Sequence, residues 1–170
     1  MMFKCENKII KNLLNFLFIL FLIFTARFIP HPPNFTIIIA LTFYVALYFG
    51  YKSSLYVLIS FILTDAILGF HNLVYFTWAS ILIISLLANK LSKTYIVRIL
   101  GVILSVLLFY IITNLGVYFF ADHGADKNLV EVFLLGAPFL ANSMICSLLF
   151  SMLAEIIVFY KTNNKPVIEN

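Results

Sequence analysis

The chain has 170 residues, of which 64% are hydrophobic and 11% are charged, and its mean hydropathy is +1.09. Soluble domains carry roughly a quarter of their residues as charged ones, so this composition excludes an ordinary soluble domain and indicates an integral membrane protein with one membrane domain. Lysines flanking membrane spans explain the net charge of +4, and we therefore expect no nucleic-acid partner.

Six apolar runs divide the chain, and each approaches or exceeds the roughly 20 residues that a helix needs to cross the hydrocarbon of a bilayer. A short N-terminus (1–8) precedes them and a tail (161–170) follows; the runs are residues 9–28, 34–51, 53–70, 73–89, 95–120 and 130–160. Because the links are short, sequential helices should pack as antiparallel neighbours. The predicted fold is an all-α, compact bundle of six transmembrane helices over residues 9–160.

The last run is long for one perpendicular crossing. Proline removes a backbone donor and clashes with the preceding turn of a helix. We therefore expect Gly136 and Pro138 to divide this run into a short outer piece and a main span.

Lysine and arginine are distributed unequally between the two sides of this predicted bundle. Arg27 and Lys127 fall on one side, and nine fall on the other: Lys4, Lys8, Lys11, Lys52, Lys90, Lys93, Arg98, Lys161 and Lys165. The positive-inside rule then places both termini in the cytoplasm. A cleaved secretory signal is the alternative for the N-terminus, but Thr25-Ala26-Arg27 is a poor cleavage site.

Asp65 lies within the third apolar run, roughly 7–8 Å by helical rise from its outer end. An intramembrane carboxylate is costly unless it has a partner or faces water, so it marks a functional site by default. We expect an outward-facing pocket with aromatic walls from Tyr44, Tyr75, Trp78 and Tyr118. The candidate ligand-binding residues are Arg27, His31, Asn34, Asp65, His71, Asn114 and Asn142.

A purely structural interpretation of the same residues is simpler. In it, Arg27 and Asp65 neutralise each other, while Asn114 and Asn142 join helices by hydrogen bonds. Glu155, near the inner end of the last run, is expected to be interfacial, with a coupling role as the alternative.

Metal binding and catalysis find little support in the residues. His31, His71 and His123 all fall on the outer side, but no two of them have the spacing of metal ligands; a metal held by a pair, or a proton-coupled step, stays an alternative. The protein is not expected to be an enzyme or to carry a cofactor, because Asp65 has no second carboxylate and no phosphate-binding loop is present.

Several motifs occur in the order typical of one uncharacterised family. They are Arg27-Phe28-Ile29-Pro30-His31-Pro32-Pro33-Asn34-Phe35-Thr36, Thr64-Asp65 with Gly69-Phe70-His71, Thr113-Asn114-Leu115-Gly116-Val117, and Gly136-Ala137-Pro138-Phe139 with Asn142. Over about residues 20–155 the chain resembles domain-of-unknown-function family 6580, bacterial proteins labelled as transport proteins. That family is similar in size and layout to the S components of energy-coupling-factor vitamin transporters.

The resemblance implies a multi-pass protein of the bacterial cytoplasmic membrane that captures a vitamin, a metal ion or another micronutrient from outside. It also implies separate ATPase and coupling subunits as partners. The first functional hypothesis is therefore a solute-binding transport protein in which Asp65 anchors the ligand, so that Asp65→Asn abolishes ligand retention in a folded protein. The second is a membrane scaffold that recruits partner proteins and needs no pocket.

Overall fold

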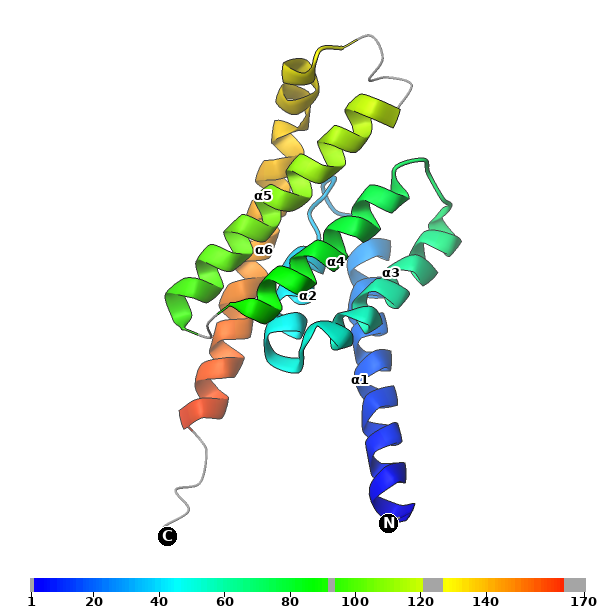
Figure 1. Ribbon diagram of the computed structural model, residues 1–170, viewed down its shortest axis with the longest axis vertical. Coiled ribbons are helices and arrows are strands. Elements are labelled where there is room, and N and C mark those ends of the chain that lie inside the picture. Colours follow the sequence, from blue (N-terminus) through cyan, green and yellow to red (C-terminus); the bar gives the residue numbers. More distant parts are fainter. Residues whose placement is uncertain (1, 92–93, 121–126, 164–170) are drawn as a thin grey trace.

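The computed structural model describes residues 2–91, 94–120 and 127–163, and these residues form helices and turns with no strand (Figure 1). The helices are α1 (Met2–Phe28), α2 (Ile38–Phe49), the 3-10 helix η1 (Tyr51–Ser53), α3 (Ser54–Leu68), α4 (Val74–Lys90), α5 (Tyr95–Phe120) and α6 (Leu129–Asn163). The predicted all-helical class is confirmed.

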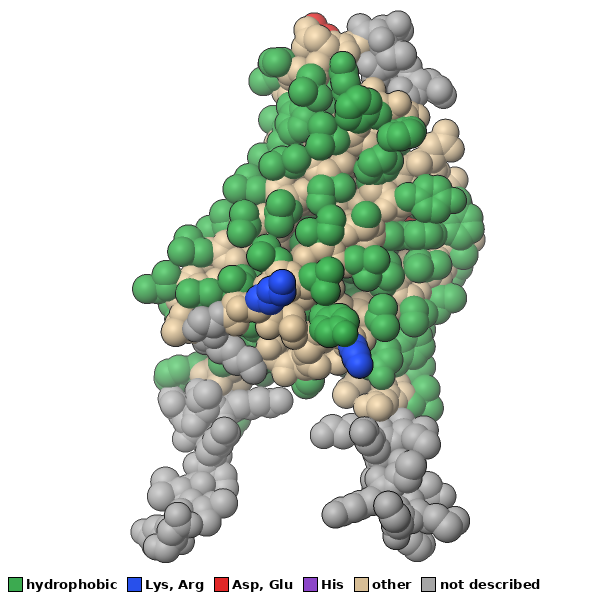
Figure 2. Space-filling model, in the orientation of Figure 1, with side chains coloured by type: hydrophobic (Ala, Val, Ile, Leu, Met, Phe, Trp, Pro, Cys, Tyr) green, Lys and Arg blue, Asp and Glu red, His purple; other side chains and the backbone are tan. Residues whose placement is uncertain are grey.

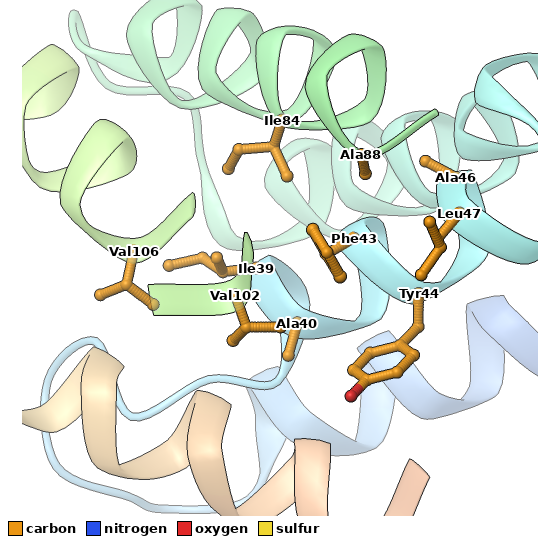
Figure 3. Packing of buried hydrophobic residues seen from close by; sticks show 10 residues of the cluster. All are labelled: Ile39, Ala40, Phe43, Tyr44, Ala46, Leu47, Ile84, Ala88, Val102 and Val106. Atoms are coloured by element: carbon orange, nitrogen blue, oxygen red, sulfur yellow. The ribbon is translucent and has the colours of Figure 1, made fainter. Parts of the chain in front are cut away.

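Helix α2 occupies the centre of the molecule. It contacts α3, α4, α5 and α6, while α1 packs on α3 and α5 packs on α6. Every residue from Ile38 to Leu47 is buried. Phe43 and its neighbours on α2 pack against Ile84 and Ala88 of α4 and against Val102 and Val106 of α5 (Figure 3).

The two ends of the molecule differ in composition. We call the end that holds the start of α1, η1, the end of α4, the start of α5 and the end of α6 the terminal end; the opposite end, with the α3–α4 turn and the start of α6, is the distal end (Figure 1). On the face drawn in Figure 2, apolar side chains cover most of the surface, and the lysine and arginine side chains lie toward the terminal end.

The boundaries of α2 and α3 follow from residues that cannot continue a helix. Pro32 and Pro33 lack a backbone N–H, and the next residue, Asn34, has φ = 60°, so α2 begins only at Ile38. Gly50 (φ = 86°) ends α2 and Gly69 (φ = 100°) ends α3. Both angles are in the region that glycine adopts at no steric cost, so these two glycines set the turns on either side of Asp65.

Helix α6 runs without interruption through Pro138. The expected division of the last run at Gly136 and Pro138 is therefore wrong. The start of α6 is capped: Asn128 Oδ1 accepts from the Glu131 N–H at 2.9 Å, and Glu131 Oε2 accepts from the Asn128 N–H at 3.2 Å. The remaining turns lose one backbone donor at the proline, which a long helix packed along α5 tolerates.

Among the described residues, three helical segments are long and apolar enough to span a membrane: Tyr51–Leu68, Tyr95–Phe120 and Leu129–Tyr160. The apolar parts of the other helices are shorter, namely Asn12–Phe28, Ile38–Phe49 and Val74–Lys90. With 12 residues, α2 is about 18 Å long, less than the roughly 30 Å of bilayer hydrocarbon. The predicted run 34–51 is thus a loop followed by a short buried helix, and crossing by all six helices stays a prediction.

Candidate functional site

Asp65 is 2% exposed and joins three helices toward the distal end. Arg27 of α1 donates from Nη1 to Asp65 Oδ1 at 2.6 Å. Trp78 of α4 donates from Nε1 to Asp65 Oδ2 at 2.8 Å. The carboxylate therefore lies between a guanidinium and an indole, and both of its oxygens have a donor.

Further contacts fix the arginine. Arg27 Nη1 also donates to Thr64 Oγ1 at 2.8 Å, and its Cζ lies 4.2 Å from the centroid of the Phe61 ring. Its side chain is 18% exposed, against 3% for that of Asp65. The pair is neutral overall, which reduces the cost of placing a carboxylate among apolar helices.

A pocket of about 290 Å³ lies beside this ion pair. It is formed at the α3–α4 turn and the first turns of α4, and its lining residues are Phe70, His71, Asn72, Val74, Tyr75 and Trp78. Trp78 belongs to both features, because its ring lines the pocket and its N–H holds Asp65. We call these six residues the aromatic pocket.

The other predicted ligand-binding residues lie elsewhere. Asn142 of α6 donates from Nδ2 to the Pro33 carbonyl at 2.9 Å, and Ser143 donates to the Asn34 carbonyl at 3.1 Å. The loop before α2 is thereby fastened to the middle of α6. His31 is exposed, and its Nδ1 lies 2.6 Å from the Ile29 carbonyl oxygen.

Asn114 lies at a second pocket, between α5 and α6. This pocket has a volume of about 210 Å³, and its lining residues are Thr113, Asn114, Val117, Lys127, Val132, Leu135, Gly136 and Phe139. Asn114 Nδ2 donates to the Tyr110 carbonyl of its own helix at 2.8 Å. Gly136 lets α6 approach here, because a Cβ at that position would lie 2.4 Å from Asn114 Oδ1.

The seven predicted residues thus occupy three places in the described structure. Arg27 and Asp65 form the ion pair, and His71 lines the adjoining pocket. Asn34 and Asn142 lie where the loop before α2 meets α6, and His31 is on that loop. Asn114 lies between α5 and α6. Of the four predicted wall residues, Tyr75 and Trp78 line the aromatic pocket, and Tyr118 packs edge-on against Phe119.

Tyr44, the remaining wall residue, belongs to a second buried charge cluster. Its hydroxyl donates to Glu155 Oε1 at 2.6 Å, and Arg98 of α5 donates from Nε to the same oxygen at 2.6 Å and from Nη2 to Oε2. Arg98 is 9% exposed. Glu155 is therefore a partner in an ion pair that ties α2, α5 and α6. Arg98, one of the nine cations on the side predicted to be cytoplasmic, is buried.

A line of hydroxyls leads along α6 to this cluster. Ser143, Ser147 and Ser151 are buried and precede Glu155 at intervals of four residues, so all four lie on one face of the helix. The sequence contained a signal for the cluster, since Arg98 and Glu155 are opposite charges near the same predicted end of two apolar runs.

The described residues contain no group of three or more His, Cys, Asp or Glu side chains that could hold a metal ion. His123 lies outside the described residues. His71 instead accepts the Leu73 N–H at Nδ1, at 3.2 Å, within its own turn.

The described residues are all-helical, with three segments long and apolar enough to cross a membrane, and a comparison with known families adds the family. The model of a family of unknown function (DUF6580) matches residues 7–165, so the chain belongs to that family over nearly its whole length. The match extends beyond the range, about residues 20–155, over which the motifs predicted it. No curated protein and no solved structure matches the chain. The similarity to S components stays a prediction.

Proposed function

We propose that this protein is a solute-binding transport protein of the bacterial cytoplasmic membrane, with both termini in the cytoplasm and the aromatic pocket open to the outside. The observation that carries the proposal is the juxtaposition of a pocket of about 290 Å³ with the buried Asp65 carboxylate, whose two oxygens are bonded to Arg27 and to the wall residue Trp78. Pockets for small solutes combine apolar walls with a few oriented polar groups in this way.

The roles of the residues follow from their contacts. Asp65 acts through Trp78, because its oxygens are occupied by Arg27 and the indole N–H. Asp65 is then a positioning residue rather than a direct ligand. His71, Asn72 and Tyr75 line the pocket and supply the polar contacts to the solute, and separate ATPase and coupling subunits supply the energy.

Purification without added solute, followed by mass spectrometry of small molecules that elute with the protein, tests this function. We expect a reproducible stoichiometric solute in the wild type and its loss in the double variant His71→Ala/Tyr75→Ala. Both side chains are exposed, Tyr75 by 70%, so the fold should tolerate the change. Tyr118→Ala, outside the pocket, is the matched control and should retain the solute.

Absence of any solute from the wild type, or full retention by the double variant, would contradict the proposal. The second candidate is a scaffold that recruits partner proteins. It is favoured by one observation: the Asp65 carboxylate is saturated by protein donors, as expected if the ion pair serves only to join α1, α3 and α4. A reproducible protein partner without a solute would support it.

A further inference from the structure

Two aromatic rings of the pocket, those of Phe70 and Tyr75, each stand nearly perpendicular to the ring of Trp78. The Phe70 and Trp78 centroids are 6.2 Å apart with an interplanar angle of 84°. The Tyr75 and Trp78 centroids are 5.6 Å apart with an angle of 77°. Phe70 lies in the α3–α4 turn and Tyr75 in the first turn of α4, so the turn brings two aromatic walls to the tryptophan.

The charge distribution behind these rings favours a cation. Trp78 donates its N–H to a carboxylate oxygen at 2.8 Å, and such a bond polarises the indole so that its ring becomes more electron-rich. Arg27 is bound to the other oxygen, Oδ1. The negative group of the pair is thus the one in contact with the pocket wall.

The remaining lining supports the same conclusion. None of the pocket-lining residues among the described part of the chain is a lysine or an arginine. A volume of about 290 Å³ is close to the lower limit of small-molecule pockets, about 300 Å³. Aromatic rings set at angles around such a space are the arrangement by which proteins hold quaternary and methylated ammonium groups.

We propose that the aromatic pocket binds small organic cations bearing a methylated or quaternary ammonium group, which sits against Trp78 between Phe70 and Tyr75. This assignment rests on the proposed solute-binding function and specifies its substrate class. His71 and Asn72, also in the lining, are available to hydrogen-bond the rest of the solute.

Trp78 is the single tryptophan of the chain, so its fluorescence reports on this pocket alone. The full chain in lipid nanodiscs is titrated with choline, with tetramethylammonium, and with the neutral isostere of choline in which carbon replaces nitrogen. We expect saturable changes in Trp78 emission with the two cations and at least about tenfold weaker binding of the isostere, since the shape is matched and only the charge differs.

Substitutions of the two flanking rings test whether those rings contribute to choline binding. Phe70→Leu and Tyr75→Leu keep the reporter and should each weaken choline binding about tenfold. Both side chains are largely exposed, by 62% and 70%, so folding should not depend on them. Tyr118→Leu is the control at a tyrosine outside the pocket and should leave choline binding unchanged.

Equal response to choline and its neutral isostere would overturn the cation assignment while leaving a solute pocket in place. No saturable response to either cation would also overturn it; the proposed function would then be decided separately by the solute that co-purifies. Unchanged choline binding in both leucine variants would show that the rings do not form the site and would overturn the inference as well.

Discussion

Asp65 shows what a single residue contributes when it is buried in an apolar setting. Its burial of 98% is tolerated because two donors from different helices satisfy both oxygens. Removing one member of such a pair leaves the other without compensation, which costs more than removing both. The pair therefore specifies how α1, α3 and α4 meet, whatever solute the neighbouring pocket holds.

We predict a coupling energy of about 1–3 kcal/mol between Arg27 and Asp65. Arg27→Gln and Asp65→Asn should each lower the free energy of unfolding in mixed micelles, and the double variant should lose less than the sum. Lys52→Gln, at an exposed lysine, is the control. Strict additivity would show that the pair contributes no interaction of its own.

At the scale of the element, α2 depends on close approach by its neighbours. Gly101 of α5 faces Phe43, and a Cβ at that position would lie 2.4 Å from the ring atom Cζ. Phe43 is fully buried and is surrounded by the α2–α4–α5 core (Figure 3). A Cβ at residue 101 would also lie 3.0 Å from Leu91 Cδ1, so the ring and its neighbour would both have to shift.

Gly101→Ala should therefore lower the free energy of unfolding by about 1–3 kcal/mol through overpacking, despite the better helix propensity of alanine. Thermal unfolding monitored in detergent measures the change. Phe43→Leu added to Gly101→Ala should recover part of the loss, because it removes the atoms that clash. An unchanged or raised stability in Gly101→Ala would mean that α5 shifts away from α2 at no cost.

At the scale of the whole molecule, the described residues hold two largely buried arginine–carboxylate pairs, and these lie in different regions. The Arg27–Asp65 pair fastens α1, α3 and α4 toward the distal end, and the Arg98–Glu155 pair fastens α2, α5 and α6 toward the terminal end (Figure 1). Between the two groups of helices lies the apolar contact of α2 and α5 with α4. Within each group an ion pair joins the helices, and between the groups apolar packing holds the helices together.

The proposed orientation predicts which introduced cysteines react with a membrane-impermeant reagent added outside intact bacterial cells. With the native cysteines replaced by serine, Asn72→Cys in the α3–α4 turn should react with a membrane-impermeant maleimide from outside. Lys52→Cys, in η1 at the terminal end, should react only after permeabilisation. Labelling in the reverse pattern would place the aromatic pocket on the cytoplasmic side and exclude capture of an external solute.

Hydropathy and charge alone were sufficient to predict the all-helical class, the three helical segments long enough to span a membrane, and Asp65 as the carboxylate of a distinctive site. These properties depend on the length of each apolar run and on the free-energy cost of one charge within it. Both quantities are set by residues that are neighbours in the sequence. The limits of α5 were also predictable, because residues 95–120 form an apolar run without proline or an acid.

The remaining features of the fold and of the site depend on how the helices pack against one another. The sequence does not show that α2 is a short central helix, that Trp78 holds Asp65, or that Tyr44 turns to Glu155 rather than to an outer pocket. Hydrogen bonds between residues 13 to 111 positions apart depend on which helix faces approach each other. Those faces are selected by glycine contacts and buried side-chain shape, which no periodicity along the chain records.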